Sequence, residues 1–123
     1  MTAKILVAED QSDLREMIAA TLSLSGYEVV AATDGAQAYE RAQADGPDLI
    51  ILDLDLPHLR GNQVCERLKS MERFNGTPIV IISAHNGAAE IEDSLRAGAQ
   101  EHICKPFELD HLTRRVAALL MGT

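Results

Sequence analysis

Leu49-Ile50-Ile51-Leu52 and Ile79-Val80-Ile81-Ile82 are the two stretches of sequence that decide the fold. Each is an uninterrupted apolar run, rich in branched residues, and its short length is typical of a strand. A strand with one face in water alternates polar and apolar side chains. A run without that alternation is therefore expected to be covered on both faces, as the strands of parallel sheets are. Further runs at 5–8, 27–32 and 102–104 predict three more strands.

Apolar residues at helical spacing fill the intervals between these runs. Five strands alternating with five helices predict a single doubly wound α/β domain, (βα)5, with helices on both faces of a parallel sheet. Because the crossovers of such sheets are right-handed, we expect the strand order 2-1-3-4-5 of flavodoxin-like domains, with the ligand site beyond the carboxyl ends of the strands. The apolar positions that mark the helices are Leu14, Met17, Ile18, Thr21 and Leu22; Ala38, Tyr39 and Ala42; Val64, Cys65, Leu68 and Met71; Ile91 and Leu95; and Leu109, Leu112, Val116, Leu119 and Leu120.

The composition argues against several classes of function. The 123 residues include 19 Asp and Glu against 11 Lys and Arg, with 3% aromatic residues and no Trp. Such an acidic chain is repelled by phosphate backbones and lacks the aromatic side chains on which bases stack, so we expect no nucleic-acid partner. No apolar run approaches the ~18 residues of a membrane span. We therefore expect no membrane partner. Cys65 and Cys104 lack the spacing of a disulfide framework, so we also expect a cytoplasmic protein.

Polar side chains follow four of the five predicted strands. Glu9 and Asp10 come after the first strand, Asp53 after the third, Ser83 after the fourth and Lys105 after the fifth. An acid at the end of one strand is more often a helix cap than a ligand, but a parallel sheet brings all these residues to one edge. Crowded carboxylates repel one another, and a divalent cation such as Mg²⁺ relieves that repulsion. The set predicts phosphoryl transfer, with an Asp carboxylate as the candidate nucleophile.

The whole chain resembles a receiver domain, the CheY-like domain of two-component response regulators. The residues that carry the resemblance are Glu9-Asp10, Asp53 with Pro57 and Gly61 after it, Ser83-Ala84, and Lys105-Pro106-Phe107.

This resemblance implies a role for each residue of the acidic edge. Asp53 would be the phosphoacceptor. Mg²⁺, or Mn²⁺ in its place, would be held by Glu9 through water, by Asp10, by Asp53 and by the backbone carbonyl of Asp55. Lys105 would pair with the phosphoryl oxygens.

The resemblance also implies a switch. Ser83, with Ala84 next to it, would bind the phosphoryl group, and the Ser83 hydroxyl would move toward it on activation. The Lys105-Pro106 peptide bond is expected to be cis. His102 stands where the family usually has a Tyr or Phe that turns inward on activation.

Two further positions are expected to set the lifetime of the phosphorylated form. Asp55, two residues after Asp53, adds a negative charge beside the site. His85, two residues after Ser83, would border the path of an attacking water.

The implied partners are a sensor histidine kinase or a histidine phosphotransfer protein. Residues 1–123 are expected to form one receiver domain with no output domain, either as a stand-alone regulator or as a part of a longer chain. Output would then be by protein contact, through the face made by the fourth helix, fifth strand and fifth helix. The protein would be a monomer, or a weak dimer through that same face.

Two alternatives compete with this interpretation. Asp53-Leu54-Asp55 also fits a phosphatase of the haloacid dehalogenase type, which uses an Asp-x-Asp motif with Ser or Thr, Lys and Mg²⁺. That motif normally follows the first strand, and no cap domain is present to bind a substrate. A flavodoxin-like FMN carrier is disfavoured because the acids would repel the phosphate and no loop rich in Ser, Thr and Gly follows the first strand.

Overall fold

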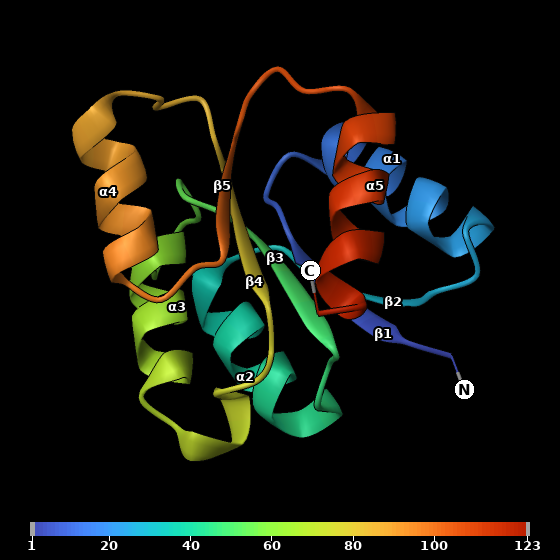
Figure 1. Ribbon diagram of the computed structural model, residues 1–123, viewed down its shortest axis with the longest axis horizontal. Coiled ribbons are helices and arrows are strands. Elements are labelled where there is room, and N and C mark those ends of the chain that lie inside the picture. The colour runs from blue at the N-terminus through green and yellow to red at the C-terminus, as the bar shows by residue number, and fades with distance from the viewer. Residues whose placement is uncertain (1, 123) are drawn as a thin grey trace.

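The computed structural model describes residues 2–122, and in it strands and helices alternate along the chain (Figure 1). The strands are β1 (Lys4–Ala8), β2 (Glu28–Ala32), β3 (Leu49–Asp53), β4 (Ile79–Ser83) and β5 (Glu101–Cys104). The helices are α1 (Ser12–Leu24), α2 (Gly35–Asp45), α3 (Gly61–Lys69), α4 (Ala88–Arg96) and α5 (Leu109–Leu120), with a short 3₁₀ helix at Glu72–Phe74.

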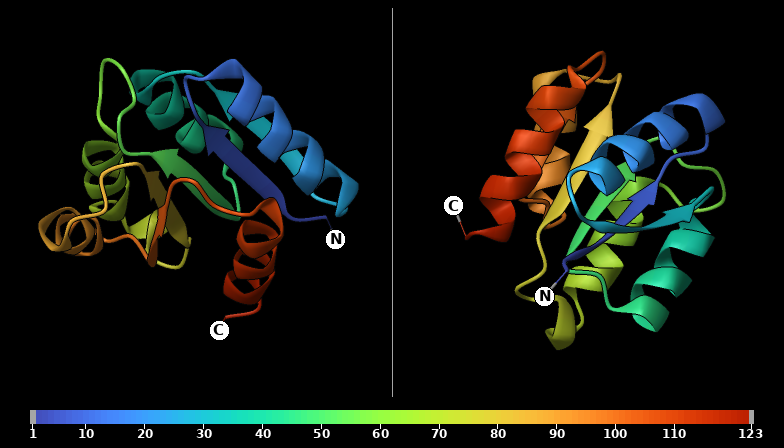
Figure 2. Two further views of the ribbon diagram at one scale, coloured as in Figure 1. Left: turned by 90° about the horizontal axis from the view of Figure 1, so that it is seen from above. Right: turned by 90° about the vertical axis from the view of Figure 1, so that its right-hand side faces the viewer.

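The five strands form one parallel sheet in the order β2-β1-β3-β4-β5, which confirms the predicted topology. In the middle of the sheet Ile51 of β3 lies between Val7 of β1 and Val80 of β4. Every residue of β3 and of β4 is buried, as their unbroken apolar runs require. Figure 2 shows α1 and α5 on one face of the sheet and the other helices on the opposite face.

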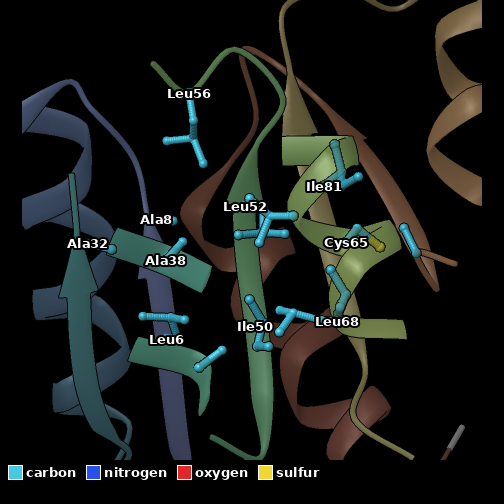
Figure 3. Close-up of a cluster of buried hydrophobic side chains, with 14 of the residues drawn as sticks. Leu6, Ala8, Ala32, Ala38, Ile50, Leu52, Leu56, Cys65, Leu68 and Ile81 are labelled. Carbon is cyan, nitrogen blue, oxygen red and sulfur yellow. The ribbon is translucent and has the colours of Figure 1, made fainter. Parts of the chain in front are cut away.

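Two hydrophobic cores, one on each face, hold the helices to the sheet. Successive side chains of a strand point to opposite faces, so β3 supplies both cores. Ile50 and Leu52 pack toward α2 and α3 in the cluster that Figure 3 shows, whereas Leu49 and Ile51 pack toward α1 and α5. The sheet is therefore held firmly from both sides, and its carboxyl edge is a rigid frame for a site.

Two positions that the helical spacing predicts to be in the core are exposed instead. Met17 of α1 is 53% exposed and Leu95 of α4 is 49% exposed. In α1 only Ile18 and Leu22 are fully buried. Helix α4 packs on the edge strand β5, so only a narrow face of the helix is covered by the sheet. Among residues 2–122, no helix is both long and apolar enough to cross a membrane.

Close backbone contacts at two glycines bring loops against the carboxyl edge of the sheet. A Cβ atom at Gly61 would lie 2.3 Å from the backbone oxygen of Asp53, so α3 can begin directly against the end of β3 only with glycine there. A Cβ atom at Gly35 would lie 1.7 Å from the backbone oxygen of Leu59. The loop that follows Asp53 is thereby packed against the start of α2.

Candidate functional site

Three carboxylates meet where β1 and β3 end. Glu9, Asp10 and Asp53 each offer an oxygen atom, and these atoms lie within 4.8 Å of one another. The cluster follows from the sheet register, because Ala8 pairs with Leu52 and the next residues are Glu9 and Asp53. Glu9 and Asp53 are buried, with exposed fractions of 0% and 3%, whereas Asp10 is exposed. An all-oxygen donor set of this kind fits a hard divalent cation such as Mg²⁺.

Lys105 reaches the cluster from the far side of β4. Its Nζ donates hydrogen bonds to Glu9 Oε1 at 3.0 Å and to Asp53 Oδ2 at 3.2 Å. Burial alone would lower the pKa of Lys105, but the hydrogen bonds and charges of Glu9 and Asp53 outweigh it and raise that pKa. The Lys105-Pro106 peptide bond is cis, as predicted. The side chain is therefore a charged group already aimed at Asp53.

Glu9 carries the strongest electrostatic perturbation of the site. Burial raises its pKa to about 7, and the nearby Asp53 charge adds to the increase. The backbone N–H of Gln11, which donates to Glu9 Oε2 at 3.0 Å, and the Lys105 ammonium oppose it. A bound cation requires the ionised carboxylate, so metal binding and proton release are linked here.

The raised pKa of Glu9 predicts a pH-dependent stability in the absence of metal. The folded protein holds the Glu9 proton more tightly than the unfolded chain, so this contribution is complete below pH 4.5 and is lost as the pH rises through 7. Between pH 5.5 and 8 the loss is about 2 kcal/mol. Urea unfolding in chelator should show this decrease in the free energy of unfolding in the parent protein and not in Glu9→Gln. Equal pH slopes for the two proteins would contradict this account.

Ser83, the last residue of β4, is buried and its hydroxyl is already engaged. Its Oγ accepts a hydrogen bond from the backbone N–H of His85 at 2.8 Å and donates to the His85 carbonyl at 3.3 Å. Ala84, between them, is exposed. A movement of the Ser83 hydroxyl toward Asp53 would have to break these local hydrogen bonds, so the resting hydroxyl is held back by its own loop.

Asp55 links the two loops that border the site. Its Oδ2 lies 3.1 Å from His85 Nε2 and its Oδ1 lies 3.4 Å from Arg60 Nη2, while its backbone N–H donates to Asp53 Oδ1 at 3.1 Å. The sequence suggested Asp55 as an added negative charge and His85 as a neighbour of the site. The structure pairs the two residues with each other, and adds Arg60, which the sequence pattern did not single out.

His102 of β5 packs toward α4. Its Nδ1 lies 2.9 Å from Ser94 Oγ, and the Ser94 hydroxyl donates to the Glu90 carbonyl at 3.1 Å. Nε2 is buried and has no hydrogen-bond partner among residues 2–122. Burial lowers the pKa of His102 below its usual value, against the opposing effects of the His85 backbone and the Glu90 charge.

Two side chains near these groups could not be assigned from the sequence. Arg15 of α1 donates from Nη1 to the backbone oxygens of Glu9, at 2.9 Å, and of Asp10, at 3.4 Å. Glu101, the residue before His102 in the sequence, is paired with Arg115 of α5. The periodicity of a helix gives no sign of either contact, because each depends on how far a long side chain reaches across to another element.

Comparison with known proteins identifies the family. The family model described as "Response regulator receiver domain" matches residues 5–117. The chain belongs to this family. The receiver domain is 38% identical over 123 residues to the response regulator MprA of Mycobacterium ulcerans, covering all of this chain and 52% of that protein. It thus spans about half the length of the curated relatives that it matches.

Solved structures agree with this assignment. The chemotaxis protein CheY4 of Vibrio cholerae is 28% identical, with a TM-score of 0.91 over 97% of this chain and 99% of that one. The signal receiver domain of a signal transduction histidine kinase from Syntrophus aciditrophicus is also 28% identical, with a TM-score of 0.91 over 99% and 92% of the two chains. The receiver domain is a signalling domain of two-component systems, and the haloacid dehalogenase and FMN-carrier alternatives receive no support.

Proposed function

We propose that this receiver domain accepts a phosphoryl group on Asp53, with Mg²⁺ or Mn²⁺ bound beside it. The observation that carries the proposal is the Lys105 ammonium, 3.2 Å from a buried Asp53 carboxylate in a cluster with two other acids. A single buried carboxylate would be neutralised by one cationic side chain. A lysine that bridges two acids while a third stands close by fits a phosphoryl group and a divalent cation in the same site.

The chemistry is a displacement at phosphorus. A carboxylate oxygen of Asp53 forms the new bond to phosphorus as the bond from phosphorus to the donor breaks, and the departing donor atom keeps the electron pair. Lys105 remains beside Asp53 and pairs with the phosphoryl oxygens. The cation would be held by Glu9 through water, by Asp10, by Asp53 and by the Asp55 carbonyl, and it would neutralise charge on the transferred group.

The family implies a histidine kinase or a histidine phosphotransfer protein as the donor. Phosphorylation would draw Ser83, beside Ala84, toward the phosphoryl group and remodel the face made by α4, β5 and α5, where His102 lies. A downstream protein, or a second copy in a weak dimer, would bind that face. In this proposal residues 1–123 act as one receiver domain in the cytoplasm, and the only reactions that it catalyses are its own phosphorylation and dephosphorylation.

Acetyl phosphate tests the proposal directly. We expect intact mass spectrometry to show one added phosphoryl group when Mg²⁺ is present and none when a chelator replaces it. Fragmentation of the modified protein should locate the group on Asp53. Modification of a different residue, or modification that persists in chelator, would overturn the assignment.

The contact between Asp55 and His85 predicts a long-lived phosphorylated form. The contact joins the loops after β3 and β4. The Asp55 carboxylate would also place a negative charge where an attacking water arrives. We expect Asp55→Ala to shorten the lifetime of the aspartyl phosphate several-fold, measured by loss of labelled phosphoryl group. His85→Ala should shorten it less, because Asp55 keeps Arg60 as a partner. A lifetime unchanged by Asp55→Ala would show that the carboxylate does not shield the site.

His102 predicts a pH-sensitive switch. A neutral imidazole is cheaper to bury than a charged one, so we expect the pKa of His102 to lie below 6.5 at rest and to fall further on activation. If the active form binds the proton less well, lowering the pH favours the resting form. NMR titration of the ring with and without a beryllofluoride phosphoryl mimic measures this. An equal or higher pKa in the activated protein would contradict the prediction.

A further inference from the structure

Arg15 holds the loop that carries the candidate metal ligands. That loop consists of residues 9–11, between the end of β1 and the start of α1. The Arg15 Nη1 atom reaches back from α1 and donates to the backbone oxygens of Glu9, at 2.9 Å, and of Asp10, at 3.4 Å. The guanidinium pairs with no carboxylate among the residues that the structure describes. Its partners are the loop backbone.

The two carbonyls that Arg15 binds belong to the peptide units on either side of the Asp10 Cα atom. The Glu9 oxygen lies on the peptide before Asp10 and the Asp10 oxygen on the peptide after it. A single guanidinium that holds both planes restricts both backbone dihedrals of Asp10, and these set the direction of its side chain.

Asp10 needs this restraint more than the other two acids do. The carboxylates of Glu9 and Asp53 are buried, and each accepts a hydrogen bond from Lys105. The Asp10 carboxylate is exposed and has no hydrogen-bond partner among residues 2–122. In the absence of a cation, its position is therefore set by its backbone, and its backbone is held by Arg15.

We infer that Arg15 is a positioning residue that preorganises Asp10 for the divalent cation. This inference rests on the proposed function, because it concerns the same metal site. Without Arg15 the backbone of Asp10 would be fully fixed only when the cation binds, and fixing the backbone of one residue costs enough to weaken binding by about tenfold. The positive charge of Arg15 acts in the opposite direction, because a nearby cation repels the metal.

Variants of Arg15 separate these two effects. Arg15→Met removes both the charge and the hydrogen bonds, whereas Arg15→Lys keeps the charge on a shorter side chain that cannot place a nitrogen where Nη1 lies. We expect Mn²⁺ affinity to fall about tenfold in Arg15→Met, and at least as much in Arg15→Lys, because the retained charge still repels the cation. Arg41→Met is the matched control, since Arg41 is an exposed arginine of α2 that has no such contact, and its Mn²⁺ affinity should match that of the parent.

Electron paramagnetic resonance of free Mn²⁺ measures this binding without any phosphoryl transfer, at a temperature where thermal melts in chelator show each variant to be folded. Competition with Mg²⁺ extends the result to that ion. Arg15→Met affinity equal to or above that of the parent would overturn the inference while leaving the proposed function intact. A parent protein that binds no Mn²⁺ would overturn both. A variant that is less stable in chelator but binds Mn²⁺ normally would show that Arg15 is only structural.

Discussion

An Asp53→Asn variant is expected to gain no phosphoryl group from acetyl phosphate under conditions in which the parent protein is modified. The amide keeps the shape of the side chain and can still accept a hydrogen bond from Lys105, so the fold should persist. The neutral amide is not a nucleophile toward phosphorus at neutral pH. Intact mass spectrometry should show a loss of at least about a hundredfold in the rate of modification.

Asp55→Asn is the matched control for this experiment. It also replaces a carboxylate at the same edge of the sheet, only two residues away. The Asp55 side chain, however, is directed toward His85 and Arg60 and not toward Lys105. The control should therefore gain the phosphoryl group at an initial rate close to that of the parent, although it should then lose the group faster because Asp55 shields it. Full modification of Asp53→Asn, or loss of modification in both variants, would contradict the assignment of Asp53 as the nucleophile.

Much of the fold follows from short runs of sequence. The runs at 49–52 and 79–82 are apolar on both faces, and only a central position in a parallel sheet satisfies such strands. Once the strands are parallel, every residue that follows a strand lies at one edge. Glu9, Asp53 and Lys105 could thus be brought together without knowledge of any side-chain conformation.

The side-chain contacts that position the residues around the site could not be predicted from the sequence pattern. Arg15 reaches back over its own helix, Arg60 reaches across a loop to Asp55, and His102 turns toward Ser94 of α4. Each depends on a choice among side-chain conformations that packing makes only after the elements are assembled. A buried serine at position 94 looks, in the sequence, like any other small polar residue of a helix.

Replacing Asp10 by Asn is expected to change metal binding and folding stability in opposite directions. Asp10 is one of three carboxylates whose oxygens lie within 4.8 Å of one another, and it is the one that Lys105 does not bind. Its charge is therefore repelled by its neighbours without a compensating ion pair in the cluster. Removing the charge should stabilise the metal-free protein by ~1 kcal/mol, while loss of an ionised ligand should weaken Mg²⁺ binding by at least tenfold.

Thermal melts in chelator and in increasing Mg²⁺ measure both effects in one series. In chelator Asp10→Asn should unfold at a higher temperature than the parent, and added Mg²⁺ should stabilise the parent far more than the variant. Asp53→Asn is the informative comparison, because it removes an equal charge but one that Lys105 partly neutralises, so its gain in stability should be smaller. The backbone carbonyl of Asp10 is unchanged by the substitution and keeps its contact with Arg15, so loop order is not the variable. If Asp10→Asn were less stable than the parent in chelator, repulsion among the acids could not be what the cation relieves.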